Sequence, residues 1–395
     1  MAKKTENKQK DQPENTKSAS NSKSQATCAE VKLRIEHKNF CLLFGPQEKT
    51  EAEPISMDSK TLLVTGGAGF MGSNFIKYIL CNYPNYKVIN LDKLTYAGNL
   101  ENLADIKDHP NYSFFKGDIS NEKDVDAALG SGVDVIINYA AETHVDRSIL
   151  DPKAFLFTDV IGTYTLLEAV RAGKAKKMIQ ISTDEVFGMV HSMQEEFSED
   201  SRFDPSSPYS ASKAGGDHLC AAYWRTYQTP VIITHSCNFY GPYQYPEKLI
   251  PLAITNLLEG KKVPVYGKGE QFREWIFTSD HCRAIDAILH KGQIGEVYNI
   301  GTRHRSKNID TIKLLLKLLN KDESSIEYVK DRAGHDFGYA VNPDKLITEL
   351  GWQPQTDFEQ GLKKTVDWYK ENEAWWKKIK SGDYLEYYKK QYKDR

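Results

Sequence analysis

The stretch TGGAGFMG, residues 65–72, decides the fold. Its glycines fit the spacing GxGxxG from Gly67 and the spacing GxxGxxG from Gly66. The largely apolar residues 60–64 before it predict a strand, and residues 70–80 after it predict a helix. A glycine-rich turn in this context brings free backbone N–H groups and the positive end of the helix dipole to an anion. The stretch therefore predicts a site for the pyrophosphate of a dinucleotide.

An acidic residue follows at the spacing that such a site requires. Asp92 lies 20 residues after Gly72, at the end of the next predicted strand. A carboxylate there accepts hydrogen bonds from ribose hydroxyls and repels a 2′-phosphate, so Asp92 favours NAD over NADP. Lys93 beside it weakens that preference. Asp118 follows a later strand, where it either contacts the adenine or only forms a turn.

Further apolar runs predict strands at residues 87–91, 112–115, 133–138, 177–182 and 230–234. Helical patterns at residues 121–129, 152–172 and 208–228 separate the later ones. This alternation predicts an α/β fold, a Rossmann-type doubly wound parallel sheet with a smaller C-terminal substrate-binding region. We expect a disordered N-terminal extension at residues 1–57, an NAD-binding Rossmann domain at 58–240 and a mainly substrate-binding region at 241–395, with some segments crossing between the last two.

The remaining composition limits the class of protein. Hydrophobic residues make up 40% and charged residues 27% of the chain, as in soluble globular proteins. The net charge of −2 gives no general attraction to nucleic acid or to an anionic membrane. The sequence shows no secretory signal, and no apolar run is long enough to span a bilayer. Six scattered cysteines without a CxxC pair predict reduced thiols, a cytoplasmic protein and no metal site.

Two short aromatic stretches leave alternatives open. Residues 40–44, FCLLF, predict a short strand or a docking element within the extension. Near the C-terminus, Trp368, Tyr369, Trp375 and Trp376 are more typical of residues that cap a core than of a ligand cage.

Two motifs carry candidate catalytic groups. The stretch ISTDEVFG, residues 181–188, places Thr183, Asp184 and Glu185 at the end of a predicted buried strand, where adjacent acids are costly unless they are used. An acidic turn that caps the next helix is the alternative. Tyr209 and Lys213 are four residues apart in YSASK, so they share a helix face. We expect the ammonium to lower the pKa of the phenol, which then removes a hydroxyl proton while hydride leaves for NAD.

The glycine turn, Tyr209 and Lys213 together resemble the extended short-chain dehydrogenase/reductase family. The Thr-Asp-Glu run is similar to that of the nucleotide-sugar 4,6-dehydratases, above all the dTDP-glucose 4,6-dehydratases. The resemblance extends from about residue 60 to near the C-terminus. It includes LDKLTYAGN at 91–99, HVDRSI at 144–149, YGPYQYPEKLIP at 240–251 and DRAGHD at 331–336.

The resemblance implies a hydro-lyase with tightly bound NAD. The activity that it implies is oxidation of dTDP-glucose at C4, elimination of water across C5 and C6, and hydride return to C6, giving a 4-keto-6-deoxy sugar. It implies that Glu185 is the base at C5, Asp184 the acid at the C6 hydroxyl, and that Thr183 binds the C4 oxygen. We expect burial and Glu185 to raise the pKa of Asp184, because an acid must be protonated when it acts.

The resemblance also implies two sets of binding residues. For NAD these are Gly66, Gly69, Phe70, Met71, Gly72, Asp92, Lys93, Leu94, Thr95, Asp118, Ile119, Tyr139, Ala140, Ala141, Thr143, Thr158, Tyr209, Lys213 and Phe239. For the nucleotide sugar they are Thr143, Thr183, Asn238, Glu247, Lys248, Leu249, Pro264, Val265, Tyr266, Arg273, Asn308, Asp331, Arg332 and His335.

Several positions depart from the family pattern and keep other functions open. Phe187, Phe239 and Ala333 differ from the usual residues, and Phe337 with Gly338 replaces a commonly Arg-rich pair near the nucleotide. UDP-glucose 4,6-dehydration is therefore an alternative. A nucleotide-sugar 4-epimerase, which needs neither acid, and a non-catalytic NAD-binding scaffold are the others. By analogy the family implies a cytoplasmic homodimer that acts in deoxyhexose synthesis, for example of rhamnose.

Overall fold

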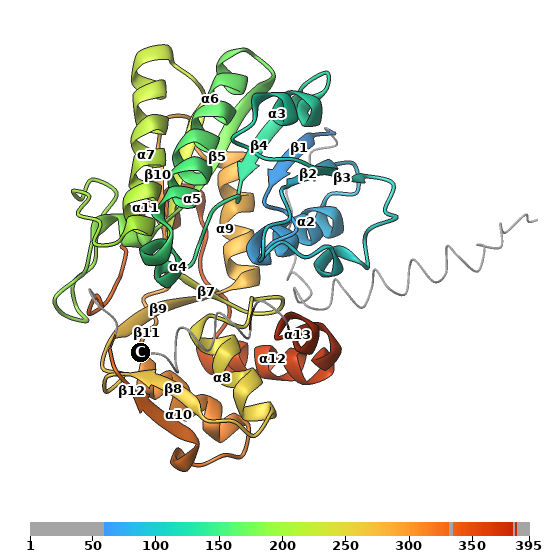
Figure 1. Cartoon of the computed structure of the whole chain (residues 1–395). Helices are drawn as coiled ribbons and strands as arrows, with labels where there is room; N and C mark the ends of the chain where they lie inside the picture. The colour runs from blue at the N-terminus through green and yellow to red at the C-terminus, as the bar shows by residue number, and fades with distance from the viewer. Residues whose placement is uncertain (1–58, 332–334, 382–383, 385–395) are drawn as a thin grey trace, which may run out of the picture.

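A seven-stranded parallel sheet forms the centre of the computed structural model, which describes residues 59–331, 335–381 and 384 (Figure 1). The strand order is β10-β6-β5-β4-β1-β2-β3, and each neighbouring pair is parallel. The strands are β1 (Thr61–Thr65), β2 (Lys87–Asp92), β3 (Tyr112–Lys116), β4 (Val133–Asn138), β5 (Ala175–Thr183), β6 (Val231–Ser236) and β10 (Val297–Ile300). This sheet confirms the predicted fold class.

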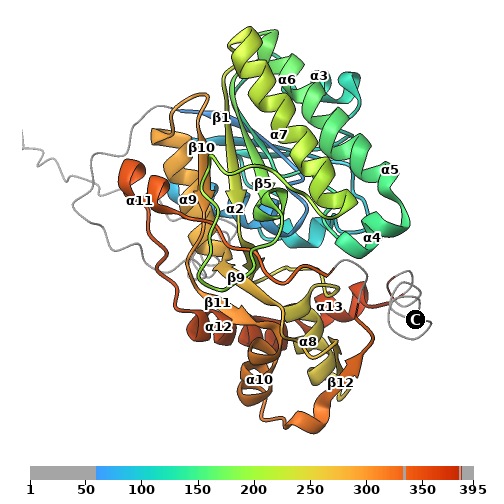
Figure 2. The ribbon, with the colours of Figure 1, turned by 90° about the vertical axis from the view of Figure 1, so that its left-hand side faces the viewer.

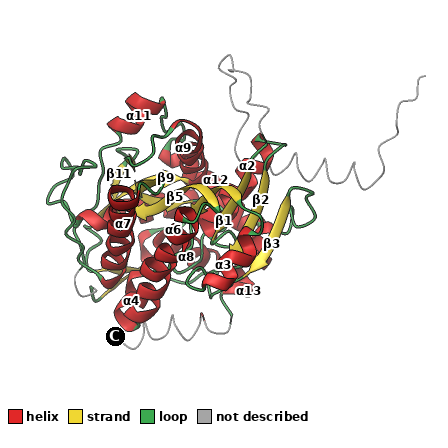
Figure 3. Cartoon of the chain, turned by 90° about the horizontal axis from the view of Figure 1, so that it is seen from above, coloured by secondary structure: helices red, strands yellow, loops and turns green. Residues whose placement is uncertain are grey.

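Helices cover both faces of the sheet, as the view from above shows (Figure 3). One face packs against α2 (Phe70–Asn82), α9 (Thr278–Lys291) and α11 (Asp344–Leu350). The other packs against α3 (Glu122–Leu129), α6 (Thr163–Arg171) and α7 (Pro208–Tyr227). Successive strand residues point to opposite faces, so Leu62 and Val64 enter the first core while Leu63 enters the second. Because both faces are buried, the strands read as apolar runs in the sequence.

The long helix predicted at residues 152–172 is divided in the structure. After α4 (Val145–Leu150) come α5 (Pro152–Phe155) and a π-helical segment, η3 (Leu156–Gly162), which continues into α6. A π-helical turn widens the helix locally and is frequent at functional sites. This one contains Thr158 and Asp159.

The C-terminal region has its own core at one end of the sheet (Figures 1 and 2). It contains a three-stranded sheet of β7 (Asn238–Tyr240), β9 (Phe272–Phe277) and β11 (Arg305–Lys307), and a pair of β8 (Val263–Tyr266) and β12 (Ile326–Val329). Its helices are α8 (Leu249–Leu258), α10 (Asn308–Leu318), α12 (Phe358–Glu371) and α13 (Glu373–Ile379). The four aromatic residues at 368, 369, 375 and 376 are buried in this core, as predicted.

The chain crosses between the two regions. Although α9, β10 and α11 come after residue 241, they pack on the central sheet or join its edge. Short 3₁₀ segments connect the larger elements: η2 (Leu100–Leu103), η4 (Asp184–Phe187) and η5 (Glu323–Ser325).

Some predictions fall outside the described residues, namely the extension at 1–57 and the aromatic stretch at 40–44. Within the described ranges, no helix has the length and apolarity that a membrane span requires. Cys220, Cys237 and Cys282 are free and buried. Cys81 is disulfide-bonded, so the prediction that all the thiols are reduced is wrong at this position. Spacing along a sequence cannot show that two sulfur atoms approach in space.

Candidate active site

A cavity of about 390 Å³ opens where the carboxyl ends of the central strands meet the C-terminal region. From the sheet side it is lined by residues at or just after the ends of β1, β2, β4, β5 and β6, namely Gly66, Asp92, Ala140, Thr183 and Ser236. From the other side it is lined by Leu249, Tyr266, Arg273 and Asn308. Ligands of open α/β sheets bind at this edge, where the strand order reverses.

The glycine-rich turn packs too closely for side chains. Gly66 has φ +63°, and a Cβ there would come within 2.7 Å of the Ala140 backbone. A Cβ on Gly72 would lie 2.3 Å from the Gly66 carbonyl oxygen. No side chain caps the start of α2, and Phe70, Met71 and Gly72 of its first turn line the cavity. This arrangement fits a pyrophosphate.

Asp92 is fixed by two backbone N–H groups at the same end of the cavity. Its Oδ2 accepts from Ala68 N at 2.9 Å and its Oδ1 from Leu94 N at 2.7 Å. Burial raises the pKa of Asp92, although these two hydrogen bonds oppose the rise. Lys93 forms an ion pair with Asp118 at 2.6 Å, so its charge is offset. The remaining lone pairs of Asp92 fit ribose hydroxyls rather than a 2′-phosphate.

At the other end, Thr183 organises the two acids. Its hydroxyl donates to Asp184 Oδ1 at 3.1 Å and accepts from Glu185 N at 3.3 Å, which starts η4. Asp184 is 1% exposed, and its Oδ2 has no hydrogen-bond partner in the described part of the chain. Burial raises the pKa of Asp184 well above its usual range, and Glu185 and then Glu274 add to the rise. This confirms the prediction for the pKa of Asp184.

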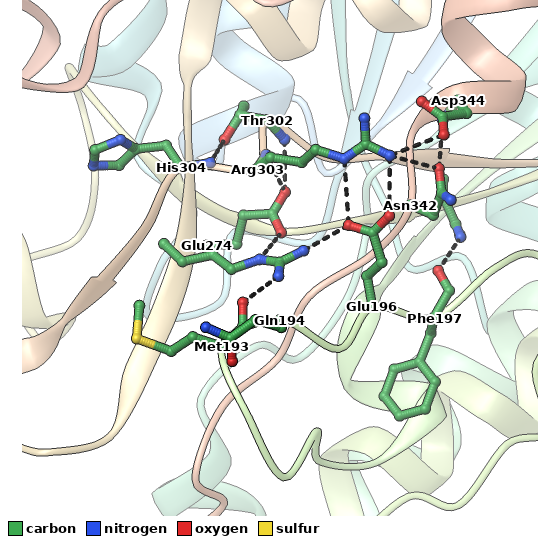
Figure 4. A network of polar contacts seen from close by, with 12 residues as sticks. Met193, Gln194, Glu196, Phe197, Glu274, Thr302, Arg303, His304, Asn342 and Asp344 are labelled. Carbon is green, nitrogen blue, oxygen red and sulfur yellow. Dashed lines mark hydrogen bonds and ion pairs between the residues drawn. The ribbon is translucent and has the colours of Figure 1, made fainter.

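Glu274, whose carboxylate contributes to the raised pKa of Asp184, is buried in a network of polar contacts (Figure 4). Its Oε1 accepts from Thr302 N at 2.6 Å and from Arg303 N at 2.9 Å. Arg303 continues to Glu196 at 3.0 Å, on the loop before α7. The network thus joins β9, the segment between β10 and β11, and that loop behind the acids.

Tyr209 lies at the start of α7, which is fixed by a capping box of Ser207 and Ser210. Burial raises the pKa of Tyr209 well above its usual range, and the Glu185 and Asp159 carboxylates act in the same direction. A hydrogen bond with the Thr183 hydroxyl opposes them. The prediction that the pKa of this phenol is lowered is therefore wrong for the protein alone.

The physical reason is the position of the Lys213 ammonium. Lys213 Nζ donates to the Ile181 carbonyl at 2.8 Å, so the ammonium is bound to the end of β5. Lys213 shares a helix face with Tyr209, as the spacing predicted, but spacing does not report the burial and the two carboxylates that outweigh it.

Asp159 is a buried acid that the sequence did not single out. Its Oδ2 accepts from Ser212 Oγ at 2.7 Å, and its Oδ1 has no hydrogen-bond partner among the described residues. Burial raises the pKa of Asp159 to about 7, although the Lys213 ammonium opposes the rise. Its neighbours come from α7, so no pattern within residues 152–172 could reveal the contact.

The wall opposite the sheet combines cations with unpaired amide oxygens. Arg273 is buried beside the Tyr339 ring at 4.6 Å. Lys248 Nζ donates to the Thr143 carbonyl at 2.5 Å. Asn238 Oδ1 and Asn308 Oδ1 are buried without a hydrogen-bond partner in the described ranges, and both residues line the cavity. Buried polar atoms of this kind are usually satisfied by a ligand or water.

Glu247 takes part in a separate cluster at the same wall. Its Oε1 accepts from Tyr96 OH at 2.9 Å, and its Oε2 accepts from Arg147 Nε at 3.1 Å. Arg147 also stacks on the Tyr96 ring at 3.7 Å. These contacts tie the loop after β2 and α4 to the segment before α8.

The structure brings most of the predicted residues together. Within the described ranges, all of them line the cavity except Asp184, Leu94 and Asp331, while Arg332 is not described. His335 Nδ1 and Asp331 Oδ1 form a hydrogen bond of 2.6 Å. The His335 ring lies edge-on to the Tyr266 ring, with 5.9 Å between the ring centroids.

Other lining residues were missed by the sequence analysis. They include Glu142, Ser182, Cys237, Tyr243, Gln244, Tyr245, Gly269, Trp275 and Ile312. The signal for Tyr243 was its place within YGPYQYPEKLIP, and that for Glu142 was its place between the predicted residues Ala141 and Thr143. Trp275 and Ile312 carry no local signal, since they reach the cavity only through the packing of β9 and α10.

Comparison with known proteins identifies the family. The chain matches the family model described as GDP-mannose 4,6 dehydratase over residues 63–365. It is 46% identical, over 359 residues, to a dTDP-glucose 4,6-dehydratase of Shigella flexneri, covering 85% of this chain and 99% of the relative.

Solved structures agree. The dTDP-glucose 4,6-dehydratase of Bacillus anthracis in complex with NAD is 51% identical, with a TM-score of 0.76, over 81% of this chain and 99% of that chain. The dTDP-glucose 4,6-dehydratase of Streptomyces venezuelae with NAD and TYD bound is 48% identical, with a TM-score of 0.78, over 81% of this chain and 99% of that chain. A UDP-glucose 4-epimerase of Thermotoga maritima is 28% identical, with a TM-score of 0.73, over 79% of this chain and 99% of that chain. The epimerase shares the fold at much lower identity, and the chain belongs to the dTDP-glucose 4,6-dehydratase family.

Proposed function

We propose that this chain is an NAD-dependent hydro-lyase that converts dTDP-glucose into its 4-keto-6-deoxy derivative. The observation that carries this proposal is the pairing of a buried acid of raised pKa, Asp184, with Glu185 beside the Thr183–Tyr209 pair. Thr183, Glu185 and Tyr209 line the cavity that begins at the glycine-rich turn, and Asp184 accepts a hydrogen bond from Thr183. Epimerisation would use the Tyr209 phenol and the glycine-rich turn, but it requires neither Asp184 nor Glu185.

The cofactor end fits NAD. The N–H groups at the start of α2 would bind the pyrophosphate, and Asp92 would accept from the adenosine ribose. When bound, NAD supplies an acceptor for hydride from C4 and a donor of hydride to C6. Ala140 and Ala141 leave room over the strand ends, and Thr158 of η3 lines the same space.

Tyr209 would remove the proton of the C4 hydroxyl. Its phenol is neutral in the protein alone, so its own proton must pass to solvent before the phenolate can accept the proton of the C4 hydroxyl. Thr183 would hydrogen-bond the same oxygen, and its hydrogen bond with the phenol supports this role. Lys213, fixed on the Ile181 carbonyl, lies one helical turn away and favours the phenolate electrostatically.

Glu185 and Asp184 would perform the elimination. The C4 ketone acidifies the C5 proton, which Glu185 removes, while Asp184 protonates the C6 hydroxyl so that water leaves. An acid of ordinary pKa would be ionised at neutral pH, but the raised pKa of Asp184 keeps its proton available. Each positioned acid or base contributes about 10²- to 10⁴-fold.

Cations on the opposite wall would bind the diphosphate, with Arg273 and Lys248 the principal candidates. Tyr266, flanked by His335, would lie against the base. We further propose that residues 58–240 form the NAD-binding domain and that residues 241–395 mainly bind the sugar nucleotide.

We also propose a cytoplasmic homodimer that acts in deoxyhexose synthesis, such as that of rhamnose. Exposed apolar side chains on consecutive helical segments support the dimer: Leu156 is 52% and Phe157 51% exposed, and Ile149, Leu150, Ile161 and Tyr164 are also exposed. An apolar face of this kind is typical of an isologous contact. Phe157→Glu should shift the chain to monomer in size-exclusion chromatography with light scattering. Tyr328→Glu, a change at an exposed tyrosine on β12, should not.

Mass spectrometry tests the activity. The purified chain is incubated with NAD and either dTDP-glucose or UDP-glucose. A product lighter by one water, with no net NADH, from dTDP-glucose supports the proposal. Preference for UDP-glucose would reassign the nucleotide, and recovery of only a C4 epimer would remove the dehydratase. Retention of NAD with no conversion of either sugar would favour the scaffold hypothesis.

A further inference from the structure

A buried hydrogen-bond relay joins α13 to the glycine-rich turn. Trp375 Nε1 donates to Asn102 Oδ1 at 2.9 Å, and Asn102 Nδ2 donates to the Ala68 carbonyl at 2.9 Å. The same carbonyl accepts from Asn99 N at 2.9 Å. Asn102 is 1% and Trp375 9% exposed, so solvent competes little for these bonds. A side chain near the C-terminus thus fixes the backbone that would hold the pyrophosphate.

The relay passes through the loop that follows β2. Thr95, Ala97 and Gly98 of this loop line the cavity, and η2 begins two residues after Gly98. On the surface, Lys378 of α13 pairs with Glu101 of η2. The loop therefore covers the cofactor end of the cavity and is tied to α13 by one buried and one exposed contact.

The helix after the turn is held by the same part of the C-terminal region. Lys77 Nζ of α2 donates to Tyr243 OH at 2.8 Å, and Asn74 Nδ2 donates to the Pro242 carbonyl at 3.1 Å. The Tyr243 ring lies 5.9 Å from that of Trp375. Tyr243 lines the cavity and has φ +68°, a backbone conformation that a bulky residue keeps only when its surroundings fix it.

We propose that Trp375 is a positioning residue whose indole N–H, acting through Asn102, holds the glycine-rich turn closed and sets how long NAD stays bound. The inference rests on the proposed function, since that reaction returns the hydride to the substrate and so requires one NAD to remain in place for the whole cycle. If the cofactor were released between oxidation and reduction, the oxidised intermediate would lack the NADH that returns hydride to C6.

A pair of matched variants tests the relay. Trp375→Phe keeps a large ring in the aromatic cluster but removes the donor to Asn102. Trp376→Phe removes an equivalent buried indole bond, which runs to the Tyr369 carbonyl at 2.8 Å inside the C-terminal core and does not touch η2. Both should lower Tm modestly, so any difference in NAD retention reports the relay rather than the core.

The measurement is the rate at which NAD leaves the holoprotein when no sugar is present, followed by chromatography of the free cofactor. Trp375→Phe should release NAD about tenfold faster than the parent, the effect of losing one buried hydrogen bond of about 1.4 kcal/mol. Trp376→Phe should release it at the parent rate. Parent-like retention by Trp375→Phe, or equally rapid loss from both variants, would overturn the proposal.

A second variant tests the connection to the turn. Asn102→Asp keeps the acceptor for Trp375 but removes the donor to Ala68, and it should also speed release. Because both changes break one relay, the double variant should release NAD little faster than either single variant, whereas independent sites would give multiplied effects.

Turnover separates this proposal from the proposed function. With saturating NAD, Trp375→Phe should dehydrate dTDP-glucose with a kcat near that of the parent, because its catalytic groups are unchanged. Failure of the parent to dehydrate the sugar would refute the function but leave the NAD release rates interpretable, since these need no sugar. A kcat that stays low at saturating NAD would instead place Trp375 in the chemistry and refute its role in retention.

Discussion

The two ends of the cavity are built on opposite principles. At the cofactor end, backbone groups dominate, and both oxygens of Asp92 accept a backbone N–H. At the acid end, Asp184 Oδ2 and Asp159 Oδ1 are buried without a hydrogen-bond partner among the described residues. The first end is fixed by packing before any ligand arrives. The second retains unfavourable electrostatics, which a substrate that takes up or supplies a proton can relieve.

The contrast predicts that the largest effect comes from a methyl group in the turn. In Gly72→Ala the new Cβ would lie 2.3 Å from the Gly66 carbonyl oxygen and 2.7 Å from Gly67 Cα, neither of which can move away freely. We expect a loss of about 3 kcal/mol in the free energy of unfolding, together with loss of NAD binding. Chemical denaturation and the NAD content of the purified protein measure the two effects.

Gly69→Ala is the control within the same turn. Its Cβ would meet only the Gly66 carbonyl oxygen, at 3.2 Å, and Gly69 has φ −79°, which alanine adopts without strain. Because Gly69 lines the cavity, this variant should fold normally and bind NAD more weakly. Equal destabilisation by the two alanines would mean that the turn is not limited by packing.

The next effect concerns Asp184, where activity and stability should move in opposite directions. Asp184→Asn removes the proton donor, so dehydration should slow by about 10²- to 10⁴-fold while C4 oxidation continues. At neutral pH the raised pKa of Asp184 means that folding must bind a proton at this position, and the amide removes that cost, so Tm should rise. Stopped-flow absorbance of NADH follows the oxidation, and mass spectrometry follows the loss of water. Abolished NAD reduction in a folded variant would show that the acid role is misassigned.

Asp92→Asn makes the same chemical change at the other end, with a different expected outcome. Asp92 accepts two N–H groups with two oxygens, whereas asparagine offers one acceptor and turns an N–H₂ toward the second donor. Tm and NAD affinity should therefore both fall. A variant at position 92 that gained stability would erase the contrast between the two ends.

The difference between the ends also explains what the sequence could predict. The turn, Asp92 and six of the seven central strands follow local patterns, since each depends on residues adjacent in the chain. β10 was missed because its place at the sheet edge depends on a segment that returns after residue 241. The high pKa of Asp184 was predictable because its principal charged neighbour, Glu185, is adjacent. That of Tyr209 was not, because it follows from burial and from two carboxylates, Glu185 and Asp159, that approach from other elements.

Asp159 gives a smaller and pH-dependent effect on stability. Its pKa of about 7 in the fold exceeds the ordinary value of 3.8, so between these pH values the folded chain holds a proton that the unfolded chain releases. Stability from this group is therefore present below about pH 4 and is lost as the pH rises through about 7. The rise of about three pKa units corresponds to about 4 kcal/mol at pH 8, and losing the hydrogen bonds that the carboxylate accepts from Ser212 and the Glu142 backbone offsets about half of it. Asp159→Asn should therefore stabilise the protein by about 2 kcal/mol at pH 8. Denaturation at pH 8 and pH 4.5 should show that this gain shrinks at the lower pH.

The smallest expected effect links Asp159 to the phenol. When ionised, Asp159 helps to raise the pKa of Tyr209, so Asp159→Asn should lower that pKa and move the acidic limb of the pH profile of C4 oxidation downward, by less than about one unit. Asp217→Asn is the control, because Asp217 of α7 is also a buried carboxylate but bonds to Ser182, at 2.6 Å, rather than acting on the phenol. Single-turnover NADH formation across pH distinguishes the two. An identical shift in both variants would mean that the limb responds to the loss of any buried carboxylate nearby, whereas a shift confined to Asp159→Asn would mean that this one buried carboxylate tunes the base.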